Sequence, residues 1–213
     1  MVKRFLSDIK KRFVNLMIML RRPRYNAKVF CIGFNKTGTT TVGKSLELLG
    51  YRNTSFNKKV FREYYKKNEI DKVLRYTAKF DSTDDLPWLK VDMIPVLDKE
   101  FLSSKFIYRT RDEKSWKKSL SNWSFNLTGK YPDLEKELNS FRKHKEFVLE
   151  YFAGRSDDFI ILDVKDPTGY KKLADFLGKT TSREAFPHFN ETKAMRKTIR
   201  DSLMEPEDIN SQG

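Results

Sequence analysis

The sequence predicts an α/β protein with a central parallel sheet that is covered by helices on both faces. Three short apolar runs are typical of buried strands, at Lys28–Gly33, Lys105–Thr110 and Phe159–Val164. Each run is followed by a segment with apolar residues at helical spacing. Strands that alternate with helices form parallel sheets, because each helix crosses back over a face of the sheet. The predicted architecture is therefore a three-layer α/β/α fold.

The composition fits one globular domain. The chain has 213 residues, of which 38% are hydrophobic, and this is enough to bury a single core although 34% are charged. Lys and Arg number 43 against 29 Asp and Glu, a net charge of +14 that attracts phosphate, sulfate, nucleic acid or an anionic membrane without choosing among them. The one cysteine, Cys31, lies in an apolar run and is expected to be a buried thiol.

The first 24 residues predict a basic amphipathic helix. Apolar residues stand at helical spacing over residues 3–20, at Phe5, Ile9, Phe13, Leu16, Met17 and Leu20. Such a helix either docks on its own domain or lies on an anionic membrane through residues 1–22. Its apolar run is too short to span a bilayer and has no cleavage site after it, which indicates a cytoplasmic protein with or without peripheral membrane contact. The chain thus divides into this helix (1–24), an α/β domain (25–203) and a loose tail (204–213).

The remaining elements follow in order along the α/β domain. The first strand leads into a helix over residues 39–49, which Gly50 ends as a C′ glycine. An acidic loop is predicted at 81–87. The other predicted helices are 58–67, 69–78, 91–101, one that begins near Asp112, 134–152 and 170–177.

The turn between the first strand and its helix is a candidate anion-binding loop, Gly33–Thr41. A glycine-containing turn at a helix N-terminus presents unpaired N–H groups and the positive end of the helix dipole. Lys36 is expected to point into this cradle, and the threonines add hydroxyl groups. The candidate binding residues are Asn35, Lys36, Thr37, Gly38, Thr39, Thr40 and Thr41.

A second register of the same turn competes with the first. Gly38–Ser45 matches the Walker A string, and Asp163 at the end of the third strand resembles a Walker B aspartate, so a P-loop nucleotide kinase or triphosphatase is the alternative. In that register the helix would begin near Lys44 and meet Gly50 after about six residues, which is short for a P-loop helix. A loop that starts at Gly33, directly at the strand end, fits the geometry better.

Several segments resemble one family. Lys36–Thr40 resembles the 5′-phosphosulfate loop of the sulfotransferases that use 3′-phosphoadenosine 5′-phosphosulfate (PAPS). Arg111, after the second strand, and Ser119, eight residues later, are similar to the family's 3′-phosphate motif, in which a guanidinium and a hydroxyl bind one phosphate. Asp163–Gly178 and Phe186–Asn190 resemble later motifs, the second of a bacterial-type branch. The resemblance covers roughly residues 29–190 and implies the P-loop-like sulfotransferase fold.

The resemblance implies sulfuryl transfer from PAPS to a hydroxyl, less readily to an amine, with PAP as product and without a metal. Lys36 would stabilise the leaving phosphate oxygen. Where the family has a histidine base before Leu-Pro, this chain has Asp85, so the resemblance makes Asp85 the candidate base, with Asp81 and Asp84 as rivals. These acids could instead cap the following helix or pair with surface lysines.

Other positions are left open by the sequence. Thr41 stands where the family often has an adenine-stacking aromatic residue, so Trp116 or a C-terminal residue would have to take that role. His144, in a charged stretch of the long helix, is expected on a solvated face, and His188 either lines the cleft or is structural. The late basic loop of the family has no clear counterpart; the available residues are Lys193, Arg196 and Lys197.

A non-catalytic basic module that binds nucleic acid or membranes is the third reading. It would explain the charge but not two anion-binding motifs that follow successive strands. The aromatic clusters that stack on single strands are not evident, so no specific nucleic-acid partner is expected. The acceptor is expected to be a small molecule or a glycan, and neither its identity nor the oligomeric state can be read from the sequence.

Overall fold

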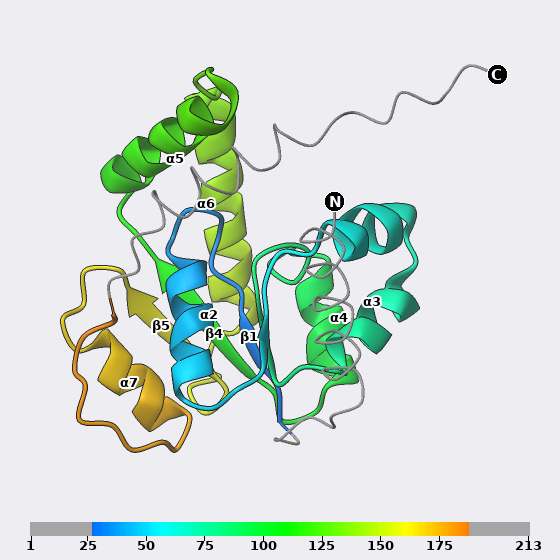
Figure 1. Ribbon diagram of the computed structural model, residues 1–213, viewed down its shortest axis with the longest axis vertical. Helices are drawn as coiled ribbons and strands as arrows, with labels where there is room; N and C mark the ends of the chain where they lie inside the picture. The colour runs from blue at the N-terminus through cyan, green and yellow to red at the C-terminus, as the bar shows by residue number, and fades with distance from the viewer. Residues whose placement is uncertain (1–26, 188–213) are drawn as a thin grey trace, which may run out of the picture.

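The computed structural model describes residues 27–187 and contains a five-stranded parallel sheet (Figure 1). The strand order is β2-β3-β1-β4-β5, and every neighbouring pair is parallel. The predicted α/β architecture with a central parallel sheet is thus confirmed. The basic helix predicted at residues 3–20 and the tail at 204–213 lie outside the described residues. The strands are β1 (Val29–Cys31), β2 (Asn53–Thr54), β3 (Ser82–Asp84), β4 (Lys105–Thr110) and β5 (Phe159–Asp163).

The helices agree closely with those expected. The basic stretch at 58–67 is divided into a π-helical segment, η1 (Val60–Tyr64), and a 3-10 turn, η2 (Tyr65–Lys67). Within residues 27–187, no helix is long and apolar enough to cross a membrane. The α-helices are α2 (Thr39–Leu48), α3 (Ile70–Thr77), α4 (Met93–Glu100), α5 (Glu113–Thr128), α6 (Leu134–Tyr151) and α7 (Gly169–Phe176).

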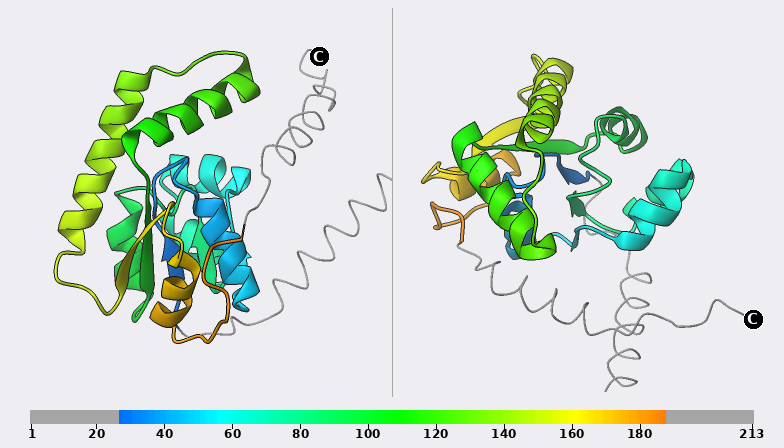
Figure 2. Two further views of the ribbon diagram at one scale, coloured as in Figure 1. Left: turned by 90° about the vertical axis from the view of Figure 1, so that its left-hand side faces the viewer. Right: turned by 90° about the horizontal axis from the view of Figure 1, so that it is seen from above.

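Side chains alternate along β1 and divide the core into two layers. Val29 and Cys31 pack with residues of α2 and α7, among them Val42, Leu46 and Leu173. Phe30 and Ile32 point the other way, and pack with residues of α3, α4 and α6, among them Val73, Leu97 and Val148. Figure 2 shows the helices on the two faces of the sheet. Cys31 is fully buried, as predicted.

The acidic run at 81–87 is not a loop throughout, because Ser82–Asp84 forms β3. This strand pairs with β1 on one side and β2 on the other. Its side chains are polar and buried, and two of them pair with Asn53 on β2: Ser82 Oγ donates to Asn53 Oδ1 at 2.9 Å, and Asn53 Nδ2 donates to Asp84 Oδ2 at 2.8 Å. Hydrophobic periodicity therefore gives no signal for β3.

Helix α2 rests directly on the end of β3 at Gly43. A Cβ atom at this position would lie 1.6 Å from Asp84 Oδ2 and 2.6 Å from Asn53 Nδ2. Only a residue without a side chain lets the helix approach so closely. The glycine thus fixes the height of α2, and with it the helix N-terminus, over the sheet.

Gly43→Ala is therefore expected to lower the free energy of unfolding by about 1–3 kcal/mol, the usual cost of overpacking. Urea denaturation measures the effect. Lys44→Ala on the same helix is the matched control, because Lys44 is exposed and its ion pair with Glu47 contributes little. Equal midpoints for the two variants would contradict this contact.

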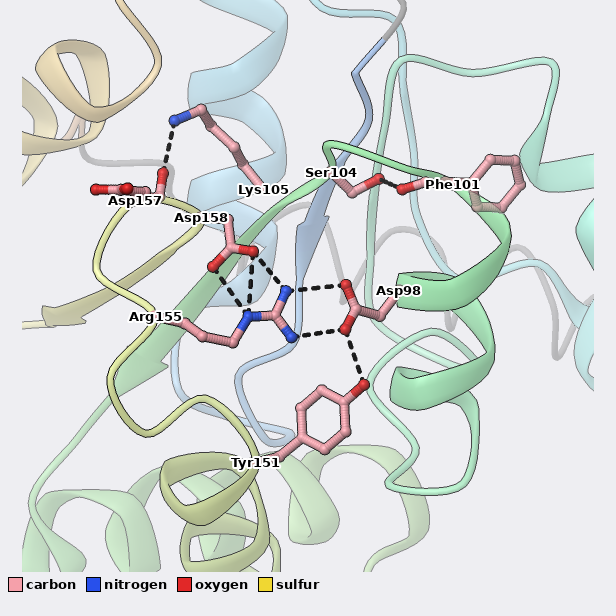
Figure 3. Close-up of polar contacts among 8 residues, drawn as sticks. All are labelled: Asp98, Phe101, Ser104, Lys105, Tyr151, Arg155, Asp157 and Asp158. Carbon is pink, nitrogen blue, oxygen red and sulfur yellow. Dashed lines mark hydrogen bonds and ion pairs between the residues drawn. The ribbon is translucent and has the colours of Figure 1, made fainter.

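A charged network joins α4 to the segment between α6 and β5 (Figure 3). Arg155 donates to both carboxylate oxygens of Asp98, at 2.6 and 3.0 Å, and also contacts Asp158. The hydroxyl of Tyr151 donates to Asp98 at 2.8 Å. Since Asp158 directly precedes β5, the network lies at the edge of the sheet where the strands begin, away from the cavity described below.

Candidate functional site

The carboxyl ends of β1, β3 and β4 meet at a cavity of about 690 Å³. In open parallel sheets this is the edge at which ligands bind. Helix α5 extends over this end of the sheet (Figure 2). The lining residues come from the segments after β1 and β2 (Phe34, Asn35, Lys36, Gly38, Thr39, Thr40, Phe56), after β3 (Asp85, Leu86), and from Arg111 onward (Arg111, Trp116, Ser119, Leu120, Trp123, Ser124, Pro132, Glu137).

The loop after β1 has the geometry of an anion cradle. Lys36 and Gly38 both have left-handed backbone, with φ of 67° and 85°. Helix α2 begins at Thr39 with no side-chain cap, so the first amide groups of the helix are left for a ligand. Two predicted binding residues do not line the cavity: the buried Thr37 hydroxyl donates to Phe34 O at 2.7 Å, and the Thr41 N–H donates to Gly38 O at 3.1 Å.

The start of α2 at Thr39 decides between the two registers. Most of the Walker A string Gly38–Ser45 is helix, and Lys44 stands on its exposed side, paired with Glu47 at 2.9 Å. Asp163, the candidate Walker B aspartate, is exposed on the outermost strand β5, where it accepts from the Lys165 N–H. Neither Lys44 nor Asp163 lines the cavity, so the Walker register is wrong.

The predicted pair Arg111 and Ser119 lies beside the cradle. Arg111 directly follows β4, and its Nη1 donates to Lys36 O at 3.1 Å while its Nε donates to Ser115 Oγ at 3.1 Å. The Asp112 side chain accepts from the Ser115 N–H and caps α5. Because the cap fixes where α5 begins, Ser119 on its second turn faces the same cavity as Arg111.

Asp85 and Lys36 place a carboxylate and an ammonium group in the wall of the cavity. Burial raises the pKa of Asp85, an effect opposed by the Leu86 N–H, which donates to Oδ1 at 2.7 Å, and by the charge of Lys36. The Lys36 Nζ lies 5.2 Å from the centroid of the Trp123 ring, within cation–π distance. Sequence reasoning did not single out Trp123, which is one of several tryptophan and phenylalanine residues on a polar helix.

The other two acids of the run do not reach the cavity. Asp81 precedes β3, at the opposite edge of the sheet; it is fully buried, and its Oδ2 accepts from the Arg52 N–H at 2.8 Å. Asp84 lies under α2 and accepts from Asn53 and Ser55, while burial raises its pKa to about 7. The structure therefore does not support Asp81 as a catalytic residue, and of the three acids of this run Asp85 is the one that lines the cavity.

Trp116 anchors the cradle. It is fully buried, its Nε1 donates to Asn35 O at 2.8 Å, and its ring stacks on Phe141 with centroids 4.6 Å apart. A ring with no exposed surface is a poor platform for adenine, so this expectation is not supported. The C-terminal candidates His188, Lys193, Arg196 and Lys197 lie outside the described residues.

His144 is buried, contrary to the expectation of a solvated face. Only 3% of its surface is exposed, its Nε2 bonds to Leu89 O at 2.8 Å, and its ring centroid is 5.1 Å from that of Phe34. Burial lowers its pKa to about 4, so the ring is neutral at pH 7. Because a carbonyl oxygen only accepts, the proton is on Nε2.

Arg109 is a second residue that the sequence did not reveal, because it sits within an apolar strand. It is 97% buried, and its guanidinium lies 3.9 Å from the centroid of the Phe186 ring. Its Nε and Nη1 have no hydrogen-bond partner among the described residues, and burial lowers its pKa to about 10. A Cβ on Gly38 would lie 3.7 Å from Nε, so Arg109 adds positive charge behind the cradle.

No group of three or more His, Cys, Asp or Glu side chains in the described part of the chain is arranged to hold a metal ion.

The chain resembles one known protein family along most of its length. The model of a sulfotransferase domain family matches residues 28–136 and 122–195. A search of curated proteins found no match.

Solved structures with a similar fold include three sulfotransferases. The sulfotransferase domain of the Synechococcus PCC 7002 olefin synthase has a TM-score of 0.50 at 12% identity, over 91% of this chain and 94% of that one. Mouse sulfotransferase SULT7A1, solved with PAP, has a TM-score of 0.49 at 13% identity, over 90% and 72%. The sulfotransferase domain of the curacin biosynthetic pathway has a TM-score of 0.49 at 16% identity, over 76% and 77%.

Proposed function

The chain belongs to the sulfotransferase domain family, and we propose that it transfers a sulfuryl group from PAPS to a hydroxyl acceptor in the cavity at the end of the sheet. One observation carries this proposal: the uncapped cradle at the start of α2 and the pair Arg111 and Ser119 line the same cavity. The cradle suits the 5′-phosphosulfate, and the pair suits the 3′-phosphate that distinguishes PAPS from ATP.

The strand order divides the cavity into two halves. Strand β4 lies on one side of β1 and β3 on the other, so Arg111 and Asp85 stand on opposite sides of the cradle. We assign the β4 side to the nucleotide. The β3 side, with Asp85, Leu86 and the exposed ring of Phe56 after β2, is left for the acceptor.

In this arrangement Asp85 removes the proton of the acceptor hydroxyl as its oxygen attacks the sulfur atom. The bond between sulfur and the bridging phosphate oxygen breaks, and its electron pair stays on that oxygen. Lys36 and the amide groups at the start of α2 stabilise the negative charge that develops there. The sulfuryl group leaves on the acceptor, the proton is on Asp85, and PAP remains to be released.

PAP is expected to bind, without added metal, about 10- to 100-fold more tightly than ADP, which lacks the 3′-phosphate. Charge-assisted hydrogen bonds from Arg111 and Ser119 contribute on the order of 1.5–3 kcal/mol. Isothermal titration measures both affinities, and Arg111→Ala should remove most of the preference.

Lys44→Ala is the control for this titration, because Lys44 points away from the cavity and should leave both affinities unchanged. ATP with Mg²⁺ tests the kinase alternative. Equal affinity for PAP and ADP, or tight Mg²⁺-dependent ATP binding that Lys44→Ala abolishes, would contradict the assignment.

A further inference from the structure

A second cavity, of about 400 Å³, adjoins the first. The two share Phe34, Asn35 and Glu137 as lining residues. The rest of the second cavity is formed by the segment that follows Asp85 and by α6: Leu89, Lys90, Val91, Ser140, Lys143, His144 and Phe147. The proposed donor contacts, Arg111 and Ser119, do not line it.

The second cavity is connected along the chain to both groups of the proposed reaction centre. Asn35 directly precedes Lys36. Lys90 belongs to the same turn as Asp85, because the Leu89 N–H donates to Asp85 O at 3.3 Å and the Lys90 N–H donates to Pro87 O at 3.0 Å. A molecule whose hydroxyl lies at Asp85 can therefore extend past Asn35 into the second cavity.

The charge of this cavity is not balanced by the protein. Lys90 and Lys143 form no ion pair with any residue among 27–187, in contrast to Lys165, which pairs with Asp112 at 2.8 Å. The one carboxylate of the lining is Glu137, on the wall shared with the first cavity. His144 is neutral, so the residues that line the second cavity alone carry two positive charges, on Lys90 and Lys143.

The rest of the lining is part apolar and part polar, because Asn35 and Ser140 add an amide and a hydroxyl group. Phe34, Leu89 and Phe147 line the cavity together with Val91, whose side chain is 39% exposed. The apolar side chains among them give no hydrogen-bond partner to a ligand, and burying polar groups without partners is costly. The combination suits a partly apolar body that carries a negatively charged group.

We propose that the second cavity, which Lys90 and Lys143 line, binds an anionic group of the acceptor, a carboxylate, sulfate or phosphate. This inference rests on the proposed function. The enzyme would then sulfate hydroxyls of molecules that already carry a negative charge away from the reacting hydroxyl. Two cations facing one anionic group also explain how such an acceptor is oriented with its hydroxyl toward Asp85.

The test uses the full chain saturated with PAP, so that the donor half is occupied. A series of ω-hydroxycarboxylates of increasing chain length is titrated against the corresponding methyl esters, which lack the charge. At the length that spans both cavities, the carboxylate is expected to bind about tenfold more tightly than its ester.

Lys90→Gln and Lys143→Gln are each expected to weaken carboxylate binding by about three- to tenfold and to leave ester binding within about twofold. Lys145→Gln is the matched control, because Lys145 is an exposed lysine of the same helix α6 that does not line the cavity. It should change neither affinity.

Each other outcome counts against the inference. Equal binding of acid and ester at every length would overturn it, as would an equal effect of Lys145→Gln. Inorganic sulfate that binds as well as the best hydroxycarboxylate would show that the cavity takes a free anion and not part of an acceptor. Failure of PAP itself to bind would instead contradict the proposed function, so the two failures are distinguishable.

Discussion

Lys36→Ala is expected to lower the turnover number about 10²–10³-fold, the usual effect of removing one group that stabilises charge in the transition state. Lys36 lines the cavity within the cradle, its carbonyl accepts from Arg111, and its Nζ lies beside Trp123. We therefore expect its ammonium group to contact the leaving phosphate oxygen. PAP formation from PAPS, with the hydroxyl acceptor that binds best in the titrations above, measures the loss.

Lys44→Ala is the matched variant for this experiment and should keep turnover close to that of the wild type. Lys44 sits on the exposed side of α2, where it pairs with Glu47. A Walker-type enzyme would show the reverse order, with Lys44 essential and Lys36 dispensable. Similar losses in both variants would mean that neither lysine contacts the leaving group.

The sequence predicted those elements whose buried faces are apolar. Strands β1, β4 and β5 are short hydrophobic runs, and α2 carries Val42 and Leu46 at helical spacing toward the sheet. Strand β3 is fully buried, but its residues are polar, and Ser82 and Asp84 find their partner on β2, about thirty residues earlier in the chain. Such pairing is decided by the tertiary structure and leaves no local pattern.

The same distinction, between local pattern and tertiary contact, explains which site residues the sequence revealed. Arg111 and Ser119 are brought together by local geometry, a strand end and two turns of the helix after it, so their spacing is informative. Asp81 and Asp85 are close in sequence, but β3 lies between them, and three strand residues span about 10 Å. His144 carried a readable signal, because Phe141 and Val148 lie on the same face of α6, but the charged neighbours obscured it.

Asp85→Asn is expected to lower turnover by about 10²–10⁴, the usual contribution of a general base, while PAP affinity stays unchanged. The amide keeps the size and polarity of the side chain but cannot take the proton of the acceptor.

The pH profile gives a second measurement of the same role. A carboxylate base acts only when ionised, so wild-type activity should rise with pH through the pKa of Asp85. Burial raises that pKa, so the acidic limb of the pH–activity profile should lie above the pKa of about 3.9 for an exposed aspartate. In Asp85→Asn the limb should disappear.

Asp81→Asn and Asp84→Asn are the controls for this assignment, because both carboxylates are buried and hydrogen-bonded away from the cavity. Each variant should lower the free energy of unfolding more than it lowers the turnover number of the folded enzyme. A denaturation curve measured beside each rate separates the two effects. If Asp84→Asn loses turnover while folded and Asp85→Asn does not, the base is the residue under α2. If all three variants stay active, no carboxylate of this run removes the proton, and the hydroxyl must be activated by another group of the acceptor half.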